Sequence, residues 1–353
     1  LAGLAAAVHD PLAGVPLADL LTDAWRAVRA AGDLDGGTDF RVPLPRLNRR
    51  EATAAARALR HALRALGAPL PPAHLCHATS GGLALLVALA ARWRDGLPYL
   101  LTEHGIYLRE RYLDYGRLVP AAVKAVLLRF FRALSRLGYA EATLIVAASR
   151  FNQRWQLRHG AHPAKVIVVP GGVDPAAFPW PLPEPTQPVV VRLGRITPLA
   201  DLETLILALK RVRQDVPAVR LRLAGPVVDT AYARVCLDLA RRLGLADAVQ
   251  LTGPVVHPAD AYAGGRVVAR CDIAEGTPYP VLEAMMCGRA TVAAAAGGVE
   301  EVLGDAGLVV PPGDPVALGT ALSSLLRDAR RRAELGLAAR RRALALFRLD
   351  PVL

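Results

Sequence analysis

The chain alternates short apolar segments of strand length with longer segments of helical pattern, and it does so in both halves. In the first half, such segments end at residues 77, 102, 147 and 169. In the second half they cover 189–193, 219–224, 249–252, 291–295 and 308–310. Strands separated by helices form parallel sheets, whose ligands bind at the carboxyl ends of the strands. The pattern therefore predicts two doubly wound α/β domains of Rossmann-like type.

A proline-rich stretch separates the two halves. With 353 residues the chain has the length of about two domains. Residues 175–187 read PAAFPWPLPEPTQ, and proline fits neither a helix interior nor a central strand. We therefore expect a first domain over 1–174, a linker over 175–187, and a second domain over 188–353 that ends in helices. Because the chain begins with Leu1 and not Met, completeness of the first domain stays open.

Composition excludes several classes of protein. Apolar residues make up 53% and charged residues 21%, which is typical of a globular chain. The net charge of +12 is almost wholly arginine and permits phosphate-bearing ligands or anionic surfaces. The basic residues are dispersed and lack interleaved aromatics, so nucleic acid is not an expected partner. The arginine runs at 330–332 and 340–342 are predicted to be solvated helix faces.

The cysteines and the apolar runs indicate a cytoplasmic protein. The four cysteines form no C-x-x-C pair and have no histidine at metal spacing, which argues against a zinc site or disulfide framework. The longest apolar run is far shorter than the roughly 20 residues that cross a bilayer. Residues 119–137 place apolar side chains against Lys124 and several arginines. This segment either lies on an anionic membrane or, as we favour, is a core helix with a basic outer face.

The stretch 270–298 reads RCDIAEGTPYPVLEAMMCGRATVAAAAGG and carries the strongest chemical signal. Seven residues separate Glu275 from Glu283, in a pattern that predicts strand, turn and helix start. Backbone N–H groups at such a turn suit anions, and a carboxylate further along can accept ribose hydroxyls. The combination suggests a nucleotide-sugar. Either glutamate alone is better explained as a group that complements the helix dipole or caps the helix.

Neighbouring motifs favour the nucleotide-sugar. AMMCG follows Glu283, and GGVEE opens the next helix at Gly297, which resembles the donor-binding signature of family 4 glycosyltransferases, the E-x7-E enzymes. TEHGIYLRER at 102–111, with the preceding turn HATSGG, is similar to PelF-type exopolysaccharide glycosyltransferases. This resemblance covers residues 71–315. It implies a GT-B fold, in which two Rossmann-like domains face a cleft.

The resemblance also implies an activity and its partners. It implies retaining transfer of a hexose from a nucleotide-sugar, UDP-linked by analogy, to a polysaccharide or glycoconjugate acceptor. The acceptor would be a carbohydrate or a lipid-linked carbohydrate, and the protein would be cytoplasmic or peripheral to a membrane synthase complex at the inner face. No metal or other cofactor is expected.

Residue roles follow the same resemblance, position by position. The catalytic candidates are Arg195 on the diphosphate, Glu275 on the donor sugar, and His104 on that sugar from the opposite domain. The donor-binding candidates are Gly194, Arg195, Gly276, Thr277, Glu283, Gly297 and Gly298. The acceptor-side candidates are His77, Glu103, Arg109 and Arg111. A lone histidine at a sheet edge is more often a hydrogen-bonded structural residue. No carboxylate is assigned as a covalent nucleophile.

Several residues depart from the family pattern. The family's second cation is a lysine in GR-x-x-P-x-KD, and this chain has Ala200 there. Loss of one preorganised donor beside a leaving group costs on the order of 10²–10³ in rate. Arg266, Arg270 and Asp272 occupy a strand that is usually apolar, and Arg192 or Arg270 is a candidate to supply the missing charge. The alternative is therefore a catalytically impaired, glycosyltransferase-like partner subunit of a membrane polysaccharide-synthesis complex.

Overall fold

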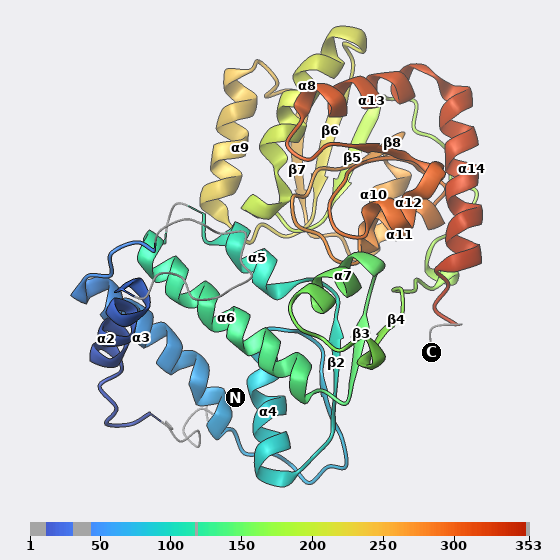
Figure 1. Cartoon of the computed structure of the whole chain (residues 1–353). Coiled ribbons are helices and arrows are strands. Elements are labelled where there is room, and N and C mark those ends of the chain that lie inside the picture. Colours follow the sequence, from blue (N-terminus) through green and yellow to red (C-terminus); the bar gives the residue numbers. More distant parts are fainter. Residues whose placement is uncertain (1–11, 31–43, 117–118, 351–353) are drawn as a thin grey trace. The chain divides into compact units, whose positions relative to one another are not determined.

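A computed structural model describes residues 12–30, 44–116 and 119–350, which form two compact α/β units (Figure 1). One unit holds the described residues up to Ala147 together with Gln153–Val168. The other holds Ala148–Asn152 and the chain from Val169 onward. The proline-rich stretch 175–187 belongs to this second unit.

The first unit is built on a four-stranded parallel sheet. Its strands are β1 (Cys76–Ala78), β2 (Tyr99–Glu103), β3 (Leu144–Ala147) and β4 (Val166–Val168), adjacent in that order. Its helices are α2 (Leu17–Ala30), α3 (Arg49–Leu63), α4 (Ala84–Asp95), α5 (Tyr107–Asp114) and α6 (Ala121–Glu141), and α7 (Arg150–Arg158) connects β3 to β4. Asn48 and Glu51 form a capping box that fixes the start of α3.

Helix α6 decides between the two interpretations of its basic and apolar pattern. Val123, Val126, Phe131 and Leu134 are buried and pack in the core of the first unit. An apolar face that is covered by its own domain leaves no area for a membrane. The core-helix prediction is therefore confirmed for this segment. None of the helices in the described part of the chain combines the length and apolarity needed to cross a bilayer.

The second unit has six parallel strands in the order β10-β9-β8-β5-β6-β7. They are β5 (Val189–Leu193), β6 (Arg220–Ala224), β7 (Val249–Gly253), β8 (Val267–Arg270), β9 (Ala290–Ala294) and β10 (Leu308–Val310). The chain runs from β5 to one edge, returns to β8 beside β5, and continues to the other edge. The pair β5 and β8 is thus the topological switch point, where open α/β sheets bind ligands.

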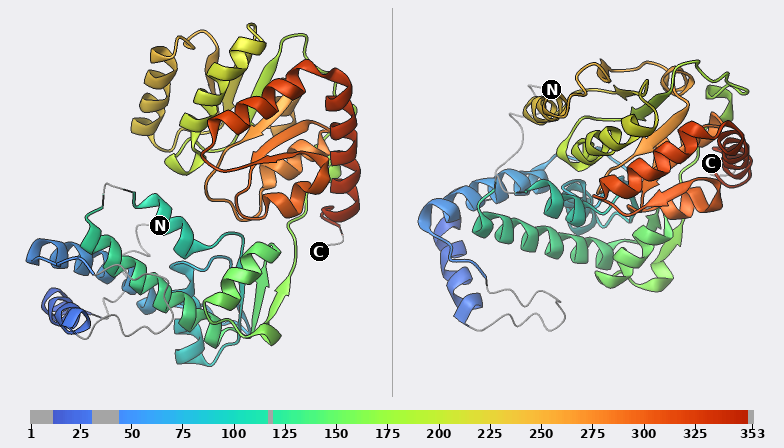
Figure 2. Two further views of the ribbon diagram at one scale, coloured as in Figure 1. Left: turned by 45° about the horizontal axis from the view of Figure 1, so that its top comes forward. Right: turned by 90° about the horizontal axis from the view of Figure 1, so that it is seen from above.

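Helices cover both faces of this sheet. One core is shared with α8 (Leu202–Asp215), α9 (Thr230–Arg242) and α13 (Pro315–Arg327). The other is shared with α10 (Pro258–Ala263), α11 (Tyr279–Met286), α12 (Val299–Leu303) and α14 (Ala329–Leu346). The last two helices, drawn in red, lie next to each other in both views of Figure 2. The strands match the predicted apolar segments, whereas no helix was predicted at α5, α7 or α10.

The arginine runs of α14 correct one prediction. Arg332, Arg340 and Arg342 are not on a solvated face. Each donates to carbonyl oxygens at the end of a different helix: Leu325 and Leu326 of α13, Met286 of α11, and Val302 of α12. Terminal carbonyls have no partner within their own helix, so a guanidinium satisfies them. The prediction holds for the exposed Arg330, Arg331 and Arg341.

Two buried arginines hold the proline-rich stretch against the second unit. Arg332, 4% exposed, pairs with Glu184 at 2.7 Å. Arg289, also 4% exposed, donates to the carbonyl of Pro183 at 2.7 Å. Because proline leaves backbone carbonyls without a neighbouring N–H donor, guanidinium groups can fix such a segment in place of secondary structure.

Candidate functional site

The two central strands of the second unit, β5 and β8, end side by side. They pair in parallel, with Val190 opposite Val267 and Val191 opposite Val268. The Gly194 turn therefore follows β5 at the sheet edge where segment 271–278 follows β8. Two motifs about 80 residues apart in sequence meet at the switch point as a result of this register.

Four charged side chains are packed between these strand ends. Arg192 donates to Asp272 Oδ1 at 2.9 Å. Arg270 donates to Glu275 Oε2 at 2.5 Å and to the carbonyl of Leu193 at 2.8 Å, and its Nε lies 3.1 Å from Asp272 Oδ2. The arginines are 1% and 6% exposed. Two positive and two negative groups balance, as a buried cluster requires.

Burial and the neighbouring charges together shift the pKa values of Glu275 and Arg270. Burial raises the pKa of Glu275, and the Arg270 guanidinium opposes that rise. The pKa of Arg270 is itself raised, because Asp272 and Glu275 outweigh its desolvation. Glu275, a predicted sugar ligand, is therefore engaged by a cation in this structure.

Arg195 differs from Arg192 and Arg270 in that its side chain is exposed. This side chain forms no ion pair with any residue the structure describes. Its carbonyl accepts from Arg192 at 2.8 Å, so both buried arginines lie against the turn that carries it. Gly194 has φ +143°, and a Cβ there would lie 2.8 Å from Arg270 Nη1. Only glycine allows this close approach of guanidinium and backbone.

Glu283 lies on α11 and is half-buried. Tyr262 on α10 donates its hydroxyl to Glu283 Oε2 at 2.8 Å. Burial raises the pKa of Glu283, while this hydrogen bond opposes the rise. Tyr262 thus orients a predicted ribose ligand, and no motif in the sequence pointed to it.

The glycine turn after β9 comes directly against the segment after β8. Gly297 has φ +61°, and a Cβ there would lie 1.7 Å from the carbonyl oxygen of Glu275. Gly298 donates its N–H to the carbonyl of Gly276 at 3.1 Å. Thr277 is buried, with no hydrogen-bond partner for Oγ1 among the described residues. The predicted donor residues on these two segments are brought together.

Ala200, at the family's lysine position, lies in the short 3₁₀-helix η4 (Pro198–Ala200). It is 1% exposed and packs in the core shared with α8. Its carbonyl accepts from the Cys271 thiol at 3.0 Å, which fixes η4 against the end of β8. No cation extends from this position. Arg192 and Arg270 do lie next to the Arg195 turn, as the charge-replacement hypothesis requires, although Asp272 and Glu275 balance them.

In the first unit, the predicted residues gather at the ends of β1 and β2. His77 is exposed, with Nε2 2.8 Å from Thr102 Oγ1, and His104 is exposed directly after β2. On α5, Arg111 pairs with Asp114 at 2.9 Å, and Arg109 is half-buried.

Glu103 is 1% exposed and faces the interior, so it is not positioned as an acceptor ligand. Its Oε2 accepts from the Tyr139 hydroxyl at 2.8 Å and from Gln156 Nε2 at 2.9 Å. Burial, partly opposed by these two bonds, raises the pKa of Glu103 to about 7. A Cβ on Gly81 would lie 1.7 Å from its Oε1, so the carboxyl also supports the turn after β1.

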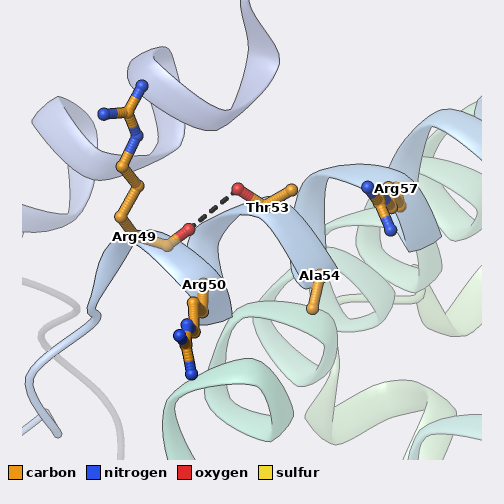
Figure 3. A pocket seen from close by; sticks show the side chains of 5 residues that line it. All are labelled: Arg49, Arg50, Thr53, Ala54 and Arg57. Atoms are coloured by element: carbon orange, nitrogen blue, oxygen red, sulfur yellow. Dashed lines mark hydrogen bonds between the residues drawn. The ribbon is translucent and has the colours of Figure 1, made fainter.

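An open hollow of about 610 Å³ lies on α3 and is lined by Arg49, Arg50, Thr53, Ala54 and Arg57 (Figure 3). Thr53 donates its hydroxyl to the carbonyl of Arg49 at 2.8 Å. The hollow contains none of the predicted site residues, so its size alone gives it no role in the site.

Comparison with known proteins identifies the second unit. Residues 187–328 match the family model described as glycosyl transferases group 1. The second unit contains a glycosyltransferase group 1 domain. Residues 44–164 match a domain of unknown function, DUF3492. The group 1 match covers β5 to α13 and therefore every charged residue of the cluster.

One of the curated relatives is named as a glycosyltransferase. The chain is 36% identical over 214 residues to D-inositol 3-phosphate glycosyltransferase of Kineococcus radiotolerans, which is 52% of this chain and 49% of that protein. The chain spans about half the length of this curated relative.

Two solved structures show the fold. HepE of Anabaena, in complex with UDP and glucose, has a TM-score of 0.68 at 22% identity and covers 86% of this chain and 79% of its own. Sucrose-phosphate synthase of Thermosynechococcus elongatus has a TM-score of 0.69 at 21% identity, with coverage of 87% and 75%. The predicted GT-B fold, with two parallel-sheet α/β domains, is confirmed.

Proposed function

We propose that the protein is a retaining glycosyltransferase of family 4 and PelF type, which moves a hexose from a UDP-linked donor to a polysaccharide or glycoconjugate acceptor. One observation carries the proposal. Arg195 and Glu275 follow the neighbouring ends of β5 and β8 at the switch point of a group 1 domain, and the Gly297 turn packs against the carbonyl of Glu275. Glu283 lies on α11, the helix that follows the same segment. The structurally similar HepE, which was solved in complex with UDP and glucose, supports the choice of donor.

The chemistry requires stabilisation of the charge that builds on the departing diphosphate. The exposed Arg195 guanidinium offers a planar fork for phosphate oxygens. Glu283, oriented by Tyr262, accepts the paired hydroxyls of the ribose. Glu275 and the backbone at Gly276 and Thr277 hold the donor sugar. In this proposal His104 contacts that sugar from the first unit, and a carbohydrate or lipid-linked acceptor is delivered at the inner face of a membrane.

A second candidate has an observation of its own. Ala200 leaves the lysine position without charge, and Arg270 engages Glu275. Both features suit a catalytically impaired relative that serves as a partner subunit in a membrane polysaccharide-synthesis complex.

Hydrolysis of UDP-hexoses separates the two candidates. We expect measurable turnover by the native chain and a loss of about 10²–10³ in kcat for Arg195→Gln, because one transition-state donor is removed. Arg330→Gln, on an exposed helix face, is the matched control and should keep full turnover. A silent native chain together with an active Ala200→Lys variant would favour the partner-subunit candidate. Because Ala200 is buried, the melting temperature of Ala200→Lys is measured in parallel.

A further inference from the structure

Arg270 lies where a cation can reach the centre of the site. It is the last residue of β8, and its Nη1 donates to the carbonyl of Leu193 at 2.8 Å. A Cβ on Gly194 would lie 2.8 Å from the same atom. The guanidinium is therefore in contact with the turn that carries Arg195, at the switch point.

Arg270 is paired with Glu275 through Nη2, but one of its N–H groups has no hydrogen-bond acceptor among the described residues. Nη2 donates to Glu275 at 2.5 Å, whereas Nε, 3.1 Å from Asp272 Oδ2, makes no hydrogen bond with a described residue. The Glu275 side chain is 17% exposed against 7% for Arg270, so the carboxylate is the more accessible partner. Asp272 has a second cation, Arg192, and does not depend on Arg270 for its charge balance.

Resting on the proposed function, we infer that Arg270 is a second phosphate-binding cation of the donor site, held by Glu275 until a donor arrives. A diphosphate carries more negative charge than one carboxylate and offers paired oxygens to a guanidinium fork. When Arg270 Nη2 donates to a phosphate oxygen instead of Glu275 Oε2, the Glu275 carboxylate becomes free to accept hydrogen bonds from sugar hydroxyls. The pair of Arg192 and Asp272 keeps the strand ends in place during this exchange.

Calorimetric titration with UDP, GDP and UDP-glucose tests the exchange. Glu275→Gln keeps the shape of the side chain but removes the charge that competes for Arg270. We expect it to bind UDP roughly tenfold more tightly than the native chain, since one charged hydrogen bond no longer has to be broken. Its gain in affinity from UDP to UDP-glucose should shrink, because Glu275 no longer serves the sugar as a carboxylate.

The double variant Arg270→Gln with Glu275→Gln isolates the guanidinium, because residue 275 is neutral in both proteins. It should bind UDP roughly tenfold more weakly than Glu275→Gln alone. Glu184→Gln breaks a similar buried-arginine pair, Arg332 with Glu184, outside the site and is the matched control. Its affinity for UDP should equal that of the native chain. Should Glu275→Gln not fold, Glu275→Asp withdraws the carboxylate by one methylene and should also tighten UDP binding.

The outcomes separate this inference from the proposed function. If the native chain binds UDP and Glu275→Gln binds it no more tightly, Arg270 is a structural ion-pair partner and the inference fails while the function stands. Equal affinities of Glu275→Gln and the double variant overturn the inference in the same way. If no variant binds UDP or GDP, both the inference and the donor function fail.

Discussion

Each unit places a largely buried glutamate near the carboxyl end of a central strand, but the surroundings of the two differ. Glu275 in the second unit accepts from Arg270 and lies in a cluster of balanced charges. Glu103 in the first unit accepts from two neutral donors, the Tyr139 hydroxyl and the Gln156 amide. Burial raises the pKa of both carboxyls, and a guanidinium opposes the rise for Glu275 alone.

The difference shows that burial alone does not assign a role to a carboxyl group. A guanidinium partner favours the ionised form, which suits a ligand for sugar hydroxyls. Neutral donors leave the protonated and ionised forms close in free energy near neutral pH, which suits a group that fixes a turn. Glu103 is thus a structural support for the turn at Gly81 and for the segment that presents His104.

The largest expected effect comes from removal of the cation in the second unit. Arg270→Leu leaves Glu275 and one side of Asp272 buried without a countercharge. Breaking a buried pair from one side costs about 3–5 kcal/mol. Trp180 is the one tryptophan of the second unit, since the other three, Trp25, Trp93 and Trp155, lie in the first. Urea unfolding followed by Trp180 fluorescence, with those three replaced by Phe, measures the loss.

Arg330→Leu is the control for this prediction, because the Arg330 side chain is 90% exposed although it also pairs with a glutamate. Exposed pairs contribute about 0–1 kcal/mol. If the two variants lose similar stability, Arg270 does not balance the buried carboxylates of Glu275 and Asp272.

The second expected effect is a pH dependence of the stability of the first unit, which we attribute to Glu103. Its pKa is about 7 in the folded chain, against an ordinary value of 4.5 for a glutamic acid. Between these values the folded state binds the proton and the unfolded state does not, so stability falls as pH rises from 4.5 to 7. The loss is at most about 3 kcal/mol, from roughly 1.4 kcal/mol per pKa unit.

Glu103→Gln keeps an acceptor for Tyr139 but cannot titrate. Urea unfolding of both proteins at about pH 5 and about pH 8, followed by fluorescence of the first-unit tryptophans, measures the difference. The native chain should lose more stability between the two pH values than Glu103→Gln. Equal losses would show that the two neutral donors do not set the charge of Glu103.

The sequence predicted the sheet of each unit because a buried parallel strand is a short apolar run, which is visible without a partner. It did not predict α5, α7 and α10, which are 8, 9 and 6 residues long. Such short helices do not show a full amphipathic repeat, and α5 and α7 are rich in charged and polar residues. Their formation depends on the tertiary contacts at their ends.

Only those residues of the candidate site that form a local sequence motif could be predicted. Glu275, Glu283 and the glycine turn form a local motif, so their spacing in sequence already indicates chemistry. The pairing of Arg192 with Asp272 joins residues 80 positions apart and depends on the register of β5 against β8. Tyr262 orients Glu283 from a helix with no motif of its own. Partners of this kind become visible only when the sheet order is known.

A third carboxylate sharpens the comparison and gives the smallest expected effect. Glu301 accepts from the backbone N–H groups of Arg150 and Phe151, at 2.8 and 2.6 Å, at the start of α7. These donors are neutral, as for Glu103, but the site is half-exposed. Water can replace a lost acceptor there, so Glu301→Ala should cost about 1 kcal/mol, the usual value of a helix cap.

Hydrogen exchange of the amides at 150 and 151 is the direct measurement, because their protection depends on the Glu301 carboxylate. Glu300→Ala, one residue earlier and exposed, is the matched control and should leave that protection unchanged. A loss for Glu301→Ala as large as for Arg270→Leu would contradict the ranking. In that case neither the exposure of a carboxylate nor the charge of its partner would explain the size of the stability loss.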